Sequence, residues 1–142
     1  MEKKVLVVSG VNLIDAGPLS VFLDFLEALV ENKYYQQYRI IAIVGKKELF
    51  ERFRDYVEIV EYRDAKKSWL NRIYLEYFGF KHLSIRWNVD TWISMHDTTP
   101  NVVAKHRYVY CHNPSLFNKM SIKDARFGIK YYIFSKLYKY LY

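Results

Sequence analysis

The chain has 142 residues, of which 51% are hydrophobic and 26% charged, with a net charge of +7 and a single cysteine. This length suits one domain that buries a core without cross-links, and the composition excludes disordered and fibrous chains. Because Cys111 has no second cysteine to pair with, an internal disulfide framework is also excluded. The positive charge suits an anionic partner, whether a membrane surface, a nucleic acid or a phosphorylated ligand.

The apolar runs are too short for a targeting or membrane-spanning segment. Residues 5–8 are interrupted at Ser9 and Gly10, which does not match a signal peptide. Residues 40–44 fall far below the roughly 20 residues that cross a bilayer. We therefore expect a cytoplasmic protein, at most peripheral on the inner face of the cell membrane.

Short β-branched runs alternate with amphipathic stretches, which is typical of βα units on a parallel sheet. Helices are predicted from Pro18, from Lys46, and from a Ser68 N-cap to a stop at Gly79, while residues 80–90 are ambiguous. Strands are predicted at residues 4–8, 39–44, 57–62, 91–95 and 107–111. The sequence thus predicts one α/β domain over residues 1–142, a three-layer Rossmann-like fold with a mostly parallel twisted sheet. The apolar face of the helix after Ser68 is predicted to comprise Trp69, Leu70, Ile73, Tyr74 and Tyr77.

Polar residues gather directly after the predicted strands, at the edge where open parallel sheets bind ligands. The first such loop ends at Gly17 and Pro18, where unsatisfied N–H groups and a helix dipole would favour an anion. It is not a G-x-G-x-x-G motif, so a dinucleotide is not indicated. Asn12 and Asp15 would either bind a polar ligand or simply close the turn, and an ordinary βα loop explains the segment equally well.

Two strand-end histidines form a second candidate site, namely His96 beside Asp97 and His112 beside Asn113. Such residues can bind a metal or transfer protons, or they can be loop histidines with structural partners. A metal would need further ligands, and Cys111 is a poor one because neighbouring strand residues point to opposite faces. We expect no metal, and we expect Cys111 to be a small buried residue.

The segment from residue 119 to residue 142 holds six Lys and Arg against a single Asp, or +5 of the total +7. On a helix it would carry apolar stripes on two nearly opposite faces. This composition suits either the interface of an anionic membrane or a helix packed against another protein part. The predicted contact residues are Lys119, Lys123, Arg126, Phe127, Lys130, Tyr131, Phe134 and Tyr138.

Four segments resemble the N-terminal domain of bacterial family 4 glycosyltransferases of GT-B fold, in particular enzymes of capsule and lipopolysaccharide assembly. These segments are VLVVSG at residues 5–10, AGPLSVFLDFL at 16–26, DTWISMHD at 90–97 and RYVYCHNPS at 107–115. The resemblance covers nearly the whole chain but only about the first half of such an enzyme. The donor-binding C-terminal domain would be missing, so we expect residues 1–142 alone to be inactive.

The resemblance implies a retaining hexosyl transfer without metal or other cofactor, from a nucleotide-sugar to a lipid-linked or glycan acceptor. His112 matches the histidine that contacts the transferred sugar, and His96 with Asp97 matches a loop on the acceptor side. Ala16 and Gly17 match a Gly-Gly loop beside the donor diphosphate, with Ala in place of the first Gly. Asn12, Asp15 and Asn113 are expected to line the same donor diphosphate and acceptor site.

Two alternatives remain open. The chain would be one subunit of a split glycosyltransferase, or a non-enzymatic basic module that binds anionic membranes. Nucleic acid is not expected as a partner, because the sequence matches no nucleic-acid-binding motif and the charge is concentrated in one segment.

Overall fold

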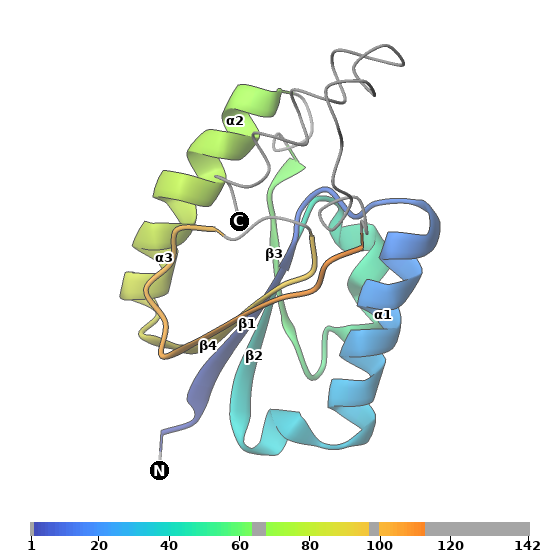
Figure 1. Cartoon of the computed structure of the whole chain (residues 1–142). Helices are drawn as coiled ribbons and strands as arrows, with labels where there is room; N and C mark the ends of the chain where they lie inside the picture. Colours follow the sequence, from blue (N-terminus) through green and yellow to red (C-terminus); the bar gives the residue numbers. More distant parts are fainter. Residues whose placement is uncertain (1, 64–67, 97–99, 113–142) are drawn as a thin grey trace, which may run out of the picture.

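The structure is a computed structural model that describes residues 2–63, 68–96 and 100–112. Its centre is a five-stranded sheet in the order β3-β2-β1-β4-β5, in which every pairing is parallel (Figure 1). The predicted α/β class is confirmed, and the arrangement is compatible with a Rossmann-like three-layer fold. The strands are β1 (Lys4–Gly10), β2 (Tyr38–Val44), β3 (Glu58–Glu61), β4 (Val89–Ser94) and β5 (His106–Val109).

The strand order reverses between β1 and β4. The chain places β2 and then β3 on one side of β1, and it returns to place β4 and β5 on the other side. Val7 therefore pairs with Ile41 of β2 and with Trp92 of β4. In an open parallel sheet such a reversal separates the loops that follow the two strands and leaves a crevice at their carboxyl ends.

The two faces of the sheet carry different helices (Figure 1). On one face α1 (Ala16–Glu31) buries Phe22, Leu26 and Leu29, and the short 3₁₀ helix η2 (Lys47–Phe53) adds Phe50 to the same apolar cluster. A further 3₁₀ turn, η1 (Tyr34–Gln36), leads into β2. Strands β1 and β2 are buried on both sides along most of their length, as strands covered by two layers must be.

The other face is covered by one continuous helical rod, made of α2 (Trp69–Tyr74), the π-helical turn η4 (Leu75–Gly79) and α3 (Phe80–Arg86). The predicted N-cap is confirmed, since Ser68 Oγ accepts a hydrogen bond from the Leu70 N–H at 3.2 Å. The predicted stop at Gly79 is wrong. Gly79 keeps a helical φ of −61°, whereas a stop requires the left-handed conformation.

The apolar face predicted for this helix is also wrong in part, because Leu70 and Tyr74 are exposed. The side that meets the sheet instead contains Glu76, Phe80 and Ser84, which follow one another at intervals of four residues. The Phe80 ring packs on Trp92 of β4 with 5.2 Å between ring centroids. Because the helix continues past Gly79, this aromatic contact sets which side of the rod faces inward.

Candidate functional site

The carboxyl edge of the sheet brings the ends of β1, β4 and β5 together. The parallel ladder continues one step past the strands, since the Met95 N–H donates to Ser9 O and the Tyr110 N–H to Ser94 O, each at 2.8 Å. Ser9 and Ser94 are fully buried here, and Ser9 Oγ accepts from the Trp92 indole at 3.1 Å. The backbone at the reversal of strand order is thus held by paired polar groups.

Both predicted histidines lie at this edge, in different surroundings. His112 is half-buried, with its Nε2 at 2.7 Å from the Met95 carbonyl and its ring 4.7 Å from that of Tyr110. A carbonyl oxygen only accepts, so Nε2 carries a proton. His96, next to Met95 in the chain, is 2% exposed and turns into the layer between sheet and helix.

His96 meets a carboxylate that the sequence pattern does not suggest. Glu76 in η4 is 3% exposed, and its Oε1 lies 2.9 Å from His96 Nε2. Arg72, one turn earlier, donates from Nε to the same oxygen at 2.8 Å. Burial on its own raises the pKa of Glu76, but the His96 ring and the Arg72 guanidinium outweigh it and lower that pKa to about 2. Glu76 is therefore ionised across the physiological range.

The π-helical turn around Glu76 is anchored to the segment that follows β4. The Asn101 N–H donates to Glu76 O at 3.1 Å, and the Asn101 side chain donates to Tyr77 O at 3.3 Å. A π-helical turn leaves carbonyl groups without their usual α-helical partners, and Asn101 satisfies two of them. Such turns are frequent at functional sites.

Two polar side chains at this edge have buried atoms without a hydrogen-bonding partner within the described part of the chain. Asn12 Oδ1 and His96 Nδ1 have no hydrogen-bonding partner there, whereas His96 Nε2 lies against Glu76 Oε1 at 2.9 Å. Asn12 and His96 are both predicted site residues. Glu76 and Arg72 were missed, and their only sequence signal is an Arg–Glu pair four residues apart on an otherwise apolar helix.

The loop after β1 contains one residue in the left-handed conformation. Ala16 has a φ of 58°, a left-handed conformation that glycine adopts far more easily. Gly17 is exposed with open space around its α-carbon, and the N-cap residue Asp15 makes no side-chain cap. Gly45, after β2, lets this loop approach, because a Cβ there would lie 2.1 Å from Val11 O.

The structure contradicts the prediction for Cys111 and does not describe the remaining predicted site residues. Cys111 is exposed rather than buried, because it lies past the end of β5 and outside both core layers. The other predicted residues lie outside the described ranges, namely Asp97, Asn113, Lys119, Lys123, Arg126, Phe127, Lys130, Tyr131, Phe134 and Tyr138.

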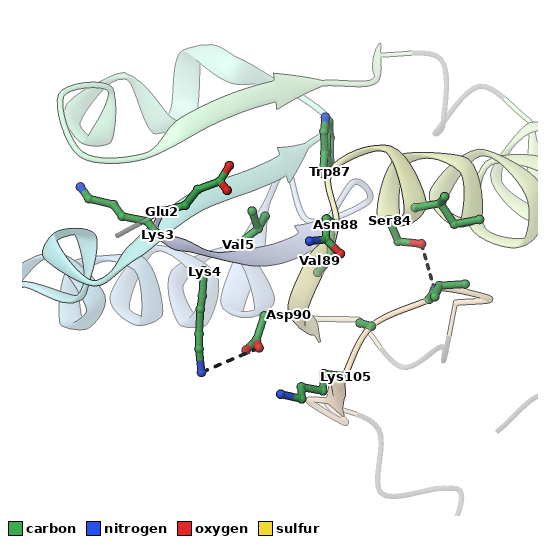
Figure 2. Close-up of a pocket in the computed structure, with 13 residues that line it drawn as sticks. Glu2, Lys3, Lys4, Val5, Ser84, Trp87, Asn88, Val89, Asp90 and Lys105 are labelled. Carbon is green, nitrogen blue, oxygen red and sulfur yellow. Dashed lines mark hydrogen bonds and ion pairs between the residues drawn. The ribbon is translucent and has the colours of Figure 1, made fainter.

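Two open clefts lie at the opposite, amino-terminal edge of the sheet. One of about 740 Å³ is lined by the start of β1, the end of α3 and the start of β4, and Lys4 lies 3.9 Å from Asp90 across it (Figure 2). The other lies between β1, β2 and β3 and shares Trp87 and Asn88 with the first. These clefts lack the unsatisfied buried groups of the carboxyl edge, so the carboxyl edge is the better candidate site on chemical grounds.

Comparisons with protein-family models, curated proteins and solved structures found no match. Within residues 2–63, 68–96 and 100–112 no three His, Cys, Asp or Glu side chains are grouped as metal ligands would be. In the same ranges no helix is both long and apolar enough to span a membrane.

Proposed function

We propose that this chain is the acceptor-side, N-terminal domain of a retaining glycosyltransferase that uses a nucleotide-sugar. The observation that carries the proposal is that the left-handed Ala16, His112 and the buried Glu76–His96 pair all lie at or beyond the carboxyl ends of strands of one parallel sheet. The resemblance of the same segments to family 4 glycosyltransferases agrees with it.

The loop after β1 would face the donor diphosphate. Its first helical N–H groups have no side-chain cap, and the positive end of the α1 dipole adds to their attraction for phosphate oxygens. The close approach of a phosphate requires an open backbone, which exposed Gly17 provides. Asn12 and Asp15 in the same loop would bind hydroxyl groups of the donor or acceptor.

His112 would contact the transferred sugar. Its hydrogen bond to Met95 O fixes the ring orientation, so contact with a sugar hydroxyl would cost little further ordering. His96, with Asp97, would lie on the acceptor side. Catalysis of this kind relies on positioning and on stabilising the departing diphosphate, and we propose no metal or other cofactor for it.

The acceptor is proposed to be a lipid-linked or polysaccharide glycan of the cell envelope. The donor-binding half would be supplied by another domain or by a second chain. The basic aromatic segment from residue 119 onward would contact that half or an anionic membrane surface. Nucleic acid is not proposed as a partner.

The test replaces His112 by Ala in the complete enzyme and measures release of nucleoside diphosphate from a panel of nucleotide-sugars. We expect turnover to fall by about 100-fold or more, within the range for loss of one transition-state contact. The matched control is His106→Ala, at the exposed start of β5. Unchanged turnover in the His112 variant would remove it from the site. No release from any donor by the folded wild-type enzyme would refute the proposed function and favour a non-enzymatic module.

A further inference from the structure

The outer side of the α2–η4–α3 rod carries an unusual set of exposed apolar side chains. Leu70 and Tyr74 are each 68% exposed, and Phe78 and Ile85 are each 57% exposed. The first three are spaced by four residues and Ile85 follows two turns later, so all four lie on one side of the helix. The rings of Tyr74 and Phe78 stack on each other at 5.5 Å.

A neighbouring segment extends this apolar surface. Val103 is 53% exposed, and its N–H donates to Ser84 Oγ at 2.9 Å, next to Ile85 in the helix. Exposed apolar patches of this kind mark interaction sites in soluble domains. We call the surface formed by Leu70, Tyr74, Phe78, Ile85 and Val103, with the cations beside it, the basic-apolar face.

The charges of the rod and of residues 100–112 are almost all positive, whereas Glu2 and Asp90 line the cleft that Ile85, Val103 and Lys105 also line. Residues 69–89 and 100–112 contain Glu76 as their only Asp or Glu, and that side chain is buried against Arg72 and His96. The exposed Lys and Arg side chains of these two segments are Lys81, Arg86, Lys105 and Arg107.

The helices on the opposite face of the sheet differ in charge, since η2 carries both signs with Lys47, Glu48, Glu51 and Arg52. Helix α1 carries Asp24, Glu27 and Glu31 and contains no Lys or Arg. Because α1 and the α2–η4–α3 rod cover different faces of the sheet (Figure 1), the acidic helix α1 lies on the face away from the rod. An anionic surface would therefore be attracted more strongly to the rod than to α1.

We infer that the basic-apolar face binds the surface of an anionic lipid bilayer. Aromatic and aliphatic side chains flanked by Lys and Arg are the composition that inserts shallowly at the headgroup level. The positive side chains attract anionic headgroups, and this attraction does not require a precise arrangement of the side chains. The inference goes beyond the proposed function and does not depend on it.

Charge argues against two other occupants of this face. A symmetric dimer through it would bring Lys81, Arg86 and Lys105 of one copy against the same residues of the other. The chain's own segment from residue 119 to 142 has six Lys and Arg and one Asp, so it would also bring positive charge to a positive surface. An anionic bilayer is the partner that both the apolar side chains and the cations fit.

The test measures sedimentation of the 142-residue chain with vesicles of phosphatidylcholine alone or mixed equally with phosphatidylglycerol. One variant combines Tyr74→Ser and Phe78→Ser, and a second combines Lys81→Gln and Arg86→Gln. All variants are made in a background with Lys123, Arg126 and Lys130 changed to Gln, so that binding by that segment is reduced. The matched control combines Lys33→Gln with Tyr34→Ser, two exposed residues next to the end of α1.

We expect binding to the anionic vesicles only, weakened about tenfold or more by each variant, weakened by added salt, and unchanged in the control. Circular dichroism would verify that each variant is folded. Three results would overturn the inference. The chain that carries only the three background substitutions would bind both vesicle types equally, or it would bind neither, or its binding would be unaffected by both variants. Self-association lost in the Tyr74 and Phe78 variant, without vesicle binding, would identify a protein interface instead and would also overturn it.

Discussion

Replacing Glu76 by Gln removes a buried negative charge while keeping nearly the same side-chain volume. Arg72 and His96 then lose the carboxylate that lies within 2.9 Å of each of them. The pKa of Glu76 falls from its ordinary value of 4.5 to about 2, and each unit corresponds to about 1.4 kcal/mol. The ionised carboxylate therefore stabilises the fold by about 3 kcal/mol, which is in the range observed when one partner of a buried ion pair is removed.

The pH dependence of this effect has a definite sign. A carboxyl whose pKa is lower in the folded state stabilises the fold above its unfolded pKa, and the stabilisation disappears as the pH falls through the folded pKa. For Glu76 the contribution should be complete above about pH 4.5 and should be lost towards pH 2. The stability difference between wild type and Glu76→Gln should therefore be constant near neutral pH and narrow between those two values.

The assay is urea unfolding followed by circular dichroism, at pH 7 and at several values down to pH 3. At pH 7 we expect Glu76→Gln to lose about 3 kcal/mol, or roughly 6–12 °C in Tm. The control is Glu27→Gln, which breaks a half-exposed pair with Arg52 at 3.0 Å and should cost less than about 1 kcal/mol. A Glu76 variant as stable as this control, or a difference that does not narrow in acid, would refute the buried pair.

Two backbone positions give further predictions. Ala16→Gly should raise stability by about 0.5–1 kcal/mol, because φ at this residue is 58°, whereas Ala28→Gly in the last turn of α1 should lower it by up to about 1 kcal/mol. Thermal unfolding compares the two, and equal losses would contradict the left-handed turn. Gly45→Ala should cost more than about 3 kcal/mol or prevent folding, since its Cβ would lie 2.1 Å from Val11 O. Gly17→Ala, with nothing within 4 Å, should stay within about 1 kcal/mol of wild type. Soluble yield and urea unfolding test this pair, and a tolerated Gly45→Ala would show that the loop does not pack there.

The α/β class could be predicted because it depends on local patterns. Strands such as β1 and β2 are continuous apolar runs, and α1 repeats its apolar residues at helical spacing. The Ser68 cap is equally local, since a side-chain oxygen at that position needs only the N–H two residues later. The placement of His96 and His112 at strand ends followed from the same reading.

Other features depend on contacts between distant segments and were not predictable. The stop expected at Gly79 failed because Phe80 gains a contact with Trp92, which outweighs the local preference of a glycine to end a helix. In the sequence Glu76 resembles an ordinary surface residue of a helix. In the structure it contacts His96, which lies 20 positions later in the chain. The partnership of the two is a property of the sheet order.

The chain sequence alone determines the βα periodicity, the net charge and the residue types available at each strand end, because these are local or additive. The distribution of charge between the two sides of the molecule arises only when the chain folds. The acidic α1 and the basic rod of residues 69–86 have opposite local charge in the sequence, yet only the reversal between β1 and β4 puts them on opposite faces. A charged surface would interact differently with these two helices because the folded chain places them on opposite faces of the sheet.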